Sequence, residues 1–331
     1  MQKWVLAMAL VTGCTLAACG SGESGKSGGG SATGQAASRP SAAAATGNAT
    51  AAQVADEARG KLKCPAKPRT PARAAGAPVD DVVGVRPGMT HDEAVGVVLC
   101  THELLVTADA GRNFRIQTHG QKLRQGFVAT FARERVQRTS QQILRDMQDG
   151  AMARANNRVV RDVNPGEAKW YVATMGLPGQ EKVISAAREE WFEAGRQPTA
   201  ASVEQALTSK YGPPTHKIHP ASPNPRHLTW AYDLRQRPIT EASPLHQQCQ
   251  ATADPDVGNN FSPDCGIVVA ATISPLRDNP ELAEYLQVAV LDQAGGYQAI
   301  ADTEQALQQQ EAQRRKEEVE QASKNASAPT L

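Results

Sequence analysis

The stretch Lys169-Trp170-Tyr171-Val172-Ala173-Thr174-Met175 carries the clearest strand signal in the chain. Residues 170, 172 and 174 alternate with residues 171, 173 and 175, which is the two-residue period of a β-strand. The Gly-Leu-Pro-Gly sequence at 176–179 follows directly and suits a type II turn. We therefore predict a strand over 170–175 and a second one over 183–187. The second continues toward residue 192, either as a long strand or by running into a helix.

Three further apolar segments, 228–232, 266–273 and 286–291, have the composition of strands. Parallel neighbours need a connection of a dozen or more residues, usually a helix, whereas antiparallel neighbours do not. The connection between 232 and 266 is long, but its prolines and cysteines favour a loop over a crossover helix. The prediction is an α+β fold with one mainly antiparallel sheet that contains all five segments.

A helix predicted over 199–211 should cover one face of this sheet. Its apolar residues recur at helical spacing, and Gly212 followed by two prolines ends it. The residues expected to pack on the sheet are Val203, Ala206, Leu207 and Tyr211.

A similar element occurs earlier in the chain. Thr90 and Glu93 form a predicted capping box at the start of a helix, after a short strand predicted over 82–85. Aligning Thr90 with Thr199 places apolar residues on apolar residues in the two helices, which is a weak internal repeat. One arrangement of the predicted fold is therefore two tandem helix-plus-sheet modules.

These signals divide the folded part of the chain into three regions. We assign a helix-rich N-terminal module to 59–165, with a strand over 127–131 and a helix over 141–157, and an antiparallel sheet module to 166–294. The tail, 295–331, is rich in Gln, Glu, Lys and Arg and is predicted to be a polar, solvated helix.

The N-terminus has the features of an export signal. Lys3 precedes an apolar run over 4–16, and the sequence Leu-Ala-Ala-Cys ends at Cys19. This resembles the lipobox of bacterial lipoproteins. The resemblance implies that the signal peptide 1–18 is removed, and that Cys19 receives a diacylglycerol group and a further acyl chain on its amine. In that family, an Asp directly after the cysteine often retains the protein in the inner membrane. This chain has Gly20 there, which implies that the protein lies in the outer membrane of a Gram-negative cell and faces the periplasm or the surface.

Three other interpretations of this segment are open. The apolar run is shorter than the about 20 residues that a transmembrane helix needs. An ordinary signal peptide would make the cysteine a coincidence. A second box ends at Cys14, but it would leave a short apolar core, so Cys19 is the expected lipidation site. The lipid anchor would place the protein on a membrane.

Residues 19–58 consist mainly of Gly, Ser, Ala and Thr and are predicted to be a flexible, lipidated tether. Residues 20–27 match the phosphate-loop pattern, but no strand precedes them and more glycine follows. We therefore assign no nucleotide site there.

Four cysteines remain after the expected cleavage: Cys64, Cys100, Cys249 and Cys265. An even number in an exported chain indicates disulfides, with three possible pairings. Local spacing favours Cys64–Cys100 and Cys249–Cys265. Four free thiols or a zinc site are the alternatives, and the absence of a Cys-x-x-Cys pair disfavours zinc.

The charge balance of 35 Lys+Arg against 34 Asp+Glu gives no basic excess that would favour nucleic acid as a partner. We expect a possible partner to be an envelope protein or polymer. The elements that begin at Thr90 and Thr199 are similar to those of uncharacterised proteobacterial envelope proteins. They also resemble the small modules of the outer-membrane assembly lipoproteins (SmpA/OmlA, BamE-like), which the β-lactamase-inhibitor proteins use twice, each with a disulfide. The resemblance implies a binding module more than an enzyme.

Few residues suggest chemistry. His216, His219 and His227 lie in or near a proline-rich segment without neighbouring Cys, Asp or Glu, so a solvated loop is expected rather than a metal site. We predict no catalytic residue, metal ion or cofactor.

One segment combines charge with large aromatic side chains, and we predict it as a binding patch: Arg188, Trp191 and Phe192. In the simpler interpretation both aromatics fill the core. The expected function is a non-enzymatic envelope lipoprotein that binds a protein or polymer. An envelope hydrolase or a proteinaceous enzyme inhibitor is the alternative.

Overall fold

The computed structural model describes residues 47–65, 70–110, 116–155, 163–219, 221 and 224–327. The predicted signal peptide, Cys19 and most of the predicted tether lie outside these residues. The described residues all belong to one compact unit. None of the described helices combines the length and the apolar character that crossing a bilayer requires.

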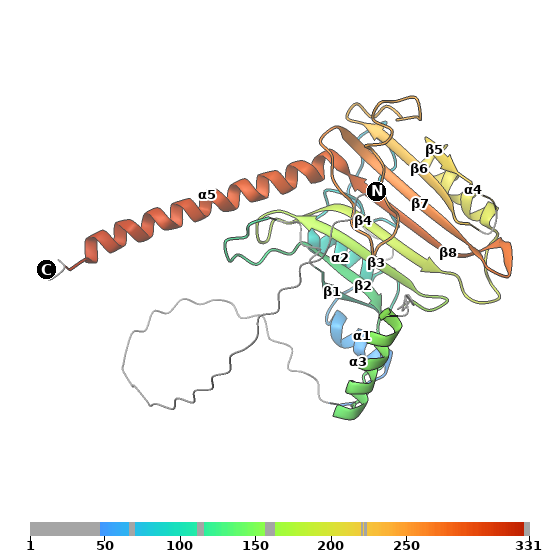
Figure 1. Cartoon of the computed structure of the whole chain (residues 1–331), viewed down its shortest axis with the longest axis horizontal. Helices are drawn as coiled ribbons and strands as arrows, with labels where there is room; N and C mark the ends of the chain where they lie inside the picture. The colour runs from blue at the N-terminus through green and yellow to red at the C-terminus, as the bar shows by residue number, and fades with distance from the viewer. Residues whose placement is uncertain are drawn as a thin grey trace, which may run out of the picture. The chain divides into compact units, whose positions relative to one another are not determined.

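The described residues form eight strands in one antiparallel sheet, in the order β1-β2-β3-β4-β8-β7-β6-β5 (Figure 1). The predicted α+β class with a mainly antiparallel sheet is thus confirmed, and all five predicted strands belong to this sheet. The strands are β1 (Leu105–Asp109), β2 (Gly126–Phe131), β3 (Ala168–Met175), β4 (Lys182–Trp191), β5 (His216–Ile218), β6 (Arg226–Asp233), β7 (Cys265–Leu276) and β8 (Asn279–Asp292). The helices are α1 (Ala51–Arg59), α2 (His91–Leu99), α3 (Ser140–Ala155), α4 (Ala200–Tyr211) and α5 (Gln293–Asn325).

The sheet is built from two halves with the same order of elements, except that α3 lies between β2 and β3 of the first half. Helix α2 is followed by β1–β4, helix α4 is followed by β5–β8, and the last strands of the halves, β4 and β8, pair at the centre. The helix caps correspond too, since Thr90 and Thr199 each accept a hydrogen bond from the third helical residue. Thr90 forms a β-bridge with Lys182 at the start of β4, and Thr199 forms one with Leu282 near the start of β8. The alignment of Thr90 with Thr199 therefore identified a structural repeat.

The boundary predicted between 165 and 166 falls between β2 and β3. These strands pair from Gly126↔Ala173 to Ala129↔Trp170, so the N-terminal half of the sheet extends through β4. The boundary between the two repeated halves lies instead between β4 and α4. Sequence periodicity marked where most of the strands lie, but the neighbour of each strand is decided by contacts across the sheet.

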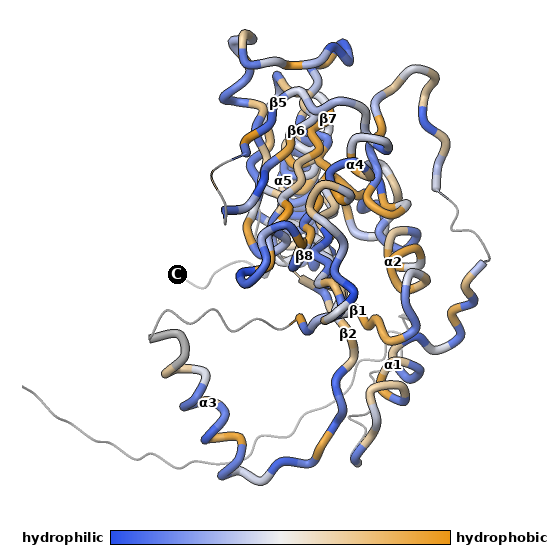
Figure 2. The backbone as a smooth tube through the Cα atoms, turned by 90° about the vertical axis from the view of Figure 1, so that its right-hand side faces the viewer, coloured by the Kyte–Doolittle hydropathy of each residue, from blue (hydrophilic) through white to orange (hydrophobic). Residues whose placement is uncertain are grey.

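Helices α2 and α4 cover one face of the sheet, and residues of α5 and of the loop 234–264 cover part of the other. On the first face, α2 and α4 share one apolar core with the strands. On the second, Phe261 of the loop and Ala299 and Ile300 of α5 pack on β3 and β4. Figure 2 shows the apolar strands between these two layers. The largest fully buried side chains include Trp170, Phe127, Met89, Trp230 and Leu291.

Helix α4 packs on the sheet as predicted through Val203, Leu207 and Tyr211, which are all buried. Ala206 was also expected there, but it is exposed. Ala206 lies beside the buried residues of α4, and its exposed side chain lines an apolar groove on the helix-covered face.

Replacing Leu207 with alanine should lower the free energy of unfolding by about 2–5 kcal/mol, because burial of its side chain is lost and a cavity remains. Leu207 is 6% exposed, whereas Leu234 is 60% exposed and offers a matched control. Leu234→Ala should change stability by less than about 0.5 kcal/mol. Urea unfolding followed by circular dichroism would measure both, and equal midpoints for the two variants would contradict this packing.

The two disulfides have the predicted pairing. Cys64–Cys100 joins the segment after α1 to the end of α2, with a Cα–Cα distance of 5.4 Å. Cys249–Cys265 joins the loop to the start of β7, with a Cα–Cα distance of 5.6 Å. Each half of the sheet therefore carries one disulfide.

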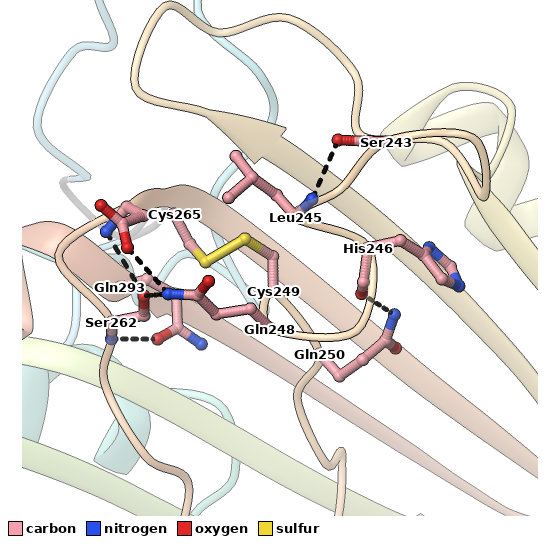
Figure 3. The surroundings of a disulfide bond; sticks show 10 residues. Ser243, Leu245, His246, Gln248, Cys249, Gln250, Ser262, Cys265 and Gln293 are labelled. Carbon is pink, nitrogen blue, oxygen red and sulfur yellow. Dashed lines mark hydrogen bonds between the residues drawn. A yellow bond between two sulfur atoms is a disulfide. The ribbon is translucent and has the colours of Figure 1, made fainter.

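The surroundings of Cys249–Cys265 hold the loop against α5 (Figure 3). The amide of Gln248 donates to Ser262 Oγ at 2.7 Å, and the Ser262 N–H donates to Gln293 Oε1 at 2.9 Å. Both cysteines are fully buried. The loop between β6 and β7 is thus an ordered excursion, as its prolines and cysteines predicted.

The end of the predicted tether is not extended chain but helix α1. Thr50 and Gln53 form a capping box, and Ala55 is buried. Arg59 donates to the carbonyl of His102 at 3.0 Å. Because alanine favours helix and these caps satisfy the helix terminus, the ordered part begins before residue 58.

Helix α3 corresponds to the helix predicted over 141–157, but its apolar residues do not reach the core. Figure 2 shows α3 apart from the sheet. Ile143, Leu144, Met147 and Met152 are all exposed. The tail predicted over 295–331 corresponds to α5, whose N-terminal half is anchored by buried residues up to the fully buried Leu307.

Candidate functional site

An apolar groove of about 290 Å³ lies on the helix-covered face at the junction of the two halves. Its floor is the β4–β8 pair, where Arg188 lies opposite Val288. One wall is α4, and the other is formed by Val82 and Val83 from the segment before α2. The volume is near the lower end of the range for small-ligand pockets, and the lining is mainly apolar as in such pockets.

Arg188 is the cationic group of the groove floor. Its side chain is 20% exposed, and its Nη1 donates to Glu190 Oε2 at 2.5 Å. The guanidinium carbon lies 5.6 Å from the centre of the Trp170 ring, which is a cation–π distance. Its Nε is buried and has no hydrogen-bond partner among the described residues. A buried donor without a partner costs free energy, and this Nε is not exposed to the groove.

The wall opposite α4 is a tight hairpin turn rather than the predicted strand over 82–85. Val82 and Val85 exchange two backbone hydrogen bonds of 2.9 Å, and the residues between them both have positive φ, 45° at Val83 and 85° at Gly84. A β-branched residue with positive φ is strained. The strained Val83 is 45% exposed at the groove. Strain of this kind is concentrated at functional sites.

The turn and α4 are tied together by Asp81. Lys210 Nζ lies 2.9 Å from Asp81 Oδ2, and the Tyr211 hydroxyl donates to the Asp81 carbonyl at 2.8 Å. Burial opposes ionisation of Asp81, but hydrogen bonds from Lys210 and the Gly84 N–H outweigh it and lower the pKa of this carboxyl. Burial raises the pKa of the Tyr211 hydroxyl. These contacts hold the two walls at a set distance.

The predicted patch of Arg188, Trp191 and Phe192 is divided between the two faces of the sheet. Arg188 and Phe192 line the groove, whereas Trp191 lies on the opposite face, because neighbouring side chains of a strand point to opposite sides. Trp191 is 7% exposed and stacks on Tyr285 with a centroid distance of 4.6 Å. Its indole N–H donates to Glu189 at 2.6 Å. Trp191 therefore has a structural role, and only two of the three residues belong to the site.

The three histidines have separate partners. His216 lies on β5 and contacts Glu241 at 2.8 Å, and His219 lies 3.2 Å from Glu204. His227 lies on β6, where burial lowers its pKa. Within the described residues, no three His, Cys, Asp or Glu side chains are grouped so that they could hold a metal ion. The predicted solvated loop is in part a short edge strand, β5.

The groove contains residues that local sequence patterns did not single out. Val82 and Val83 resembled a strand, and Ala206 resembled a core position, yet all three line the groove. The valine followed by glycine at 83–84 was the available signal, because glycine favours a turn at such a position. No protein-family model, curated protein or solved structure matches this chain.

Proposed function

We propose that the chain is a lipid-anchored protein of the bacterial envelope whose folded part is a non-enzymatic binding module. The anchor is supported by the Leu-Ala-Ala-Cys sequence that ends at Cys19, behind an apolar run. The binding role is supported by the groove between α4 and the turn at Val83. The partner would be an envelope protein or polymer that inserts an apolar group there.

The lining of the groove suits binding better than acid–base chemistry. Apart from Arg188 and Lys210, the lining side chains are aliphatic or aromatic. A guanidinium does not give up its proton in proteins, so Arg188 can orient an anion but cannot act as a general base. Lys210 is held by Asp81. Arg188 is likewise paired with Glu190. A mainly apolar pocket whose two cationic groups are both paired is suited to bind an apolar group of a partner.

The groove is also preformed. Its floor is a central strand pair, and its walls are joined by the contacts of Asp81 with Lys210 and Tyr211. Val83 and Phe192 place apolar side chains at its edge. Preorganised apolar pockets of this kind accept the anchor residues of protein partners, since little ordering is needed on binding.

A proteinaceous enzyme inhibitor is the second candidate. The resemblance to the β-lactamase-inhibitor proteins implies two helix–helix–three-strand modules with one disulfide each. The two halves of this sheet share the disulfide in each half with that arrangement, but each half has four strands. In that case the captured partner would be an enzyme, and its activity would fall on binding.

Crosslinking and capture from detergent-solubilised envelope tests the binding role. Ala206→Phe should fill the groove from an exposed position of α4. This variant should therefore no longer capture the partner. Ala201→Phe introduces the same side chain at an exposed position of the same helix outside the groove, and should leave capture unchanged. A partner that is retained equally by both variants would contradict a role for the groove.

A further inference from the structure

We infer that helix α3 lies on the surface of the membrane to which Cys19 anchors the chain, with its apolar side chains among the lipids. This inference rests on the proposed lipid anchor. It gives the folded part a second contact with the same membrane, separate from the groove.

Helix α3 has an exposed apolar stripe. Ile143, Met147 and Ala151 follow one another at intervals of four residues, and Leu144 lies beside them on the same face of the helix. Ile143, Leu144 and Met147 are 48%, 57% and 65% exposed. Asp149 lies on the opposite face. Because an amphipathic helix normally covers its apolar face, we expect the stripe to meet an apolar surface outside the described fold.

Contacts within its own segment hold α3 in place of packing on the sheet. The Thr139 hydroxyl accepts a hydrogen bond from the Gln142 N–H at 3.3 Å, and Gln142 Oε1 accepts one from the Thr139 N–H at 2.8 Å, which is a capping box. Arg138 Nη1 lies 2.7 Å from Asp146 Oδ2. The helix is therefore formed while its apolar stripe stays exposed.

The predicted tether joins the fold at the base of α3. Ala49 and Arg135 exchange two backbone hydrogen bonds of 2.9 and 2.8 Å, and the Gln137 N–H donates to Asn48 Oδ1 at 2.9 Å. Helix α3 begins shortly afterwards, at Ser140. The end of the tether and the start of the exposed helix are thus held together by paired residues.

The length of the predicted tether allows the whole helix to reach the membrane. Between Cys19 and Asn48 the chain has 28 residues, and a chain of this length rich in small residues has an r.m.s. span of about 30 Å. The 16 residues of α3 measure about 24 Å. A short tether keeps its cargo at an effective concentration on the order of mM, so a weak affinity of the stripe for lipid is sufficient.

The composition of the stripe suits lipid better than a protein partner. Protein interfaces concentrate their binding energy in Trp, Tyr and Arg, whereas the stripe consists of aliphatic side chains and Met147. The described charged side chains of α3 are Arg145, Asp146 and Asp149, which form no basic cluster. The contact would therefore depend on burial of apolar side chains and not on anionic lipid.

The test places one fluorescent label on each face of α3 in the full lipoprotein. Met147→Cys puts the label in the stripe, and Asp149→Cys puts the same label on the opposite face as the matched control. The introduced cysteine is the single free thiol, because lipidation occupies Cys19 and the other cysteines of the mature chain form two disulfides. The labelled protein is inserted into phosphatidylcholine vesicles that contain a lipid spin-labelled near its headgroup.

We expect the spin-labelled lipid to quench most of the fluorescence at residue 147 and little at residue 149, since the apolar face of such a helix lies about 5–10 Å into the boundary between headgroups and acyl chains. Adding Leu144→Asp to Met147→Cys should remove this quenching, because a carboxylate in the stripe opposes insertion. The melting temperature should stay unchanged, because Leu144 is exposed.

Equal quenching at both positions, or quenching at neither, in vesicle-bound protein would overturn the inference and leave the lipid anchor standing. Crosslinking of two copies through the cysteine at residue 147, without quenching, would assign the stripe to self-association and also overturn it. Protein that does not float with the vesicles would overturn both the anchor and this inference.

Discussion

Replacing Cys19 with serine should release the protein from the membrane fraction or stop its processing. With Cys19 intact, the expected lipoprotein carries three acyl chains, and each buried CH₂ contributes about 0.8 kcal/mol. One chain alone gives marginal, reversible binding to the membrane, whereas several chains hold nearly all of the protein there. Loss of all the chains should therefore release nearly all of the protein. Fractionation of cells and mass spectrometry of the N-terminal peptide would measure the effect.

Cys14→Ser is the matched control, because Cys14 ends the second sequence that fits the lipobox. This variant should stay in the membrane fraction with an N-terminus at Cys19. Release by Cys14→Ser instead of Cys19→Ser would move the cleavage site to residue 14. Protein that remains soluble and unmodified with both cysteines intact would remove the lipoprotein assignment.

Removing both disulfides should bring the folded unit close to the limit of stability. The cysteines are separated by 36 residues in Cys64–Cys100 and by 16 in Cys249–Cys265. In the chain-entropy model these loops correspond to about 4 and about 3 kcal/mol. Their sum is comparable to the net stability of a typical domain, about 5–15 kcal/mol. A variant with four serines should therefore unfold at a much lower urea concentration.

The two double variants separate the contributions. Cys64→Ser with Cys100→Ser and Cys249→Ser with Cys265→Ser should each lose part of the stability, and the losses should add because the sites lie in different halves. Reductant should open Cys64–Cys100 first, since Cys64 is exposed and both cysteines of the other pair are buried. A four-serine variant with an unchanged urea midpoint would contradict the disulfide framework.

Local signals in the sequence predicted much of the fold. The alternation in 170–175, the stop after Tyr211 and the capping box at Thr90 depend on neighbours a few residues away, and the structure has the corresponding strand and helices. The cysteine pairing was predictable because both pairs close local loops. Strands β1 and β5 were missed, since they are short and their apolar pattern is weak.

The candidate site was predictable only in part. Arg188 and Phe192 were singled out by composition, but grouping them with Trp191 ignored the alternation of side chains along β4. In the strand, residues 188 and 192 share a face and residue 191 lies on the other. The alternation of side chains along a strand would have separated Trp191 from Arg188 and Phe192 before the structure was known, if the whole segment had been predicted as a strand.

The sequence by itself determined the type of most of the main elements, favoured the disulfide pairing that is present and led us to expect a lipid anchor, because each of these depends on short-range patterns. Only the tertiary structure decided that β4 pairs with β8 and that a groove opens above this pair. The groove is formed by Val83, Arg188, Leu207 and Val288, which are far apart in the chain. Periodicity reports which face of an element is apolar, but it does not report which other element that face meets. The distances between such residues are set by the packing of the whole sheet, and the site exists only once that packing is complete.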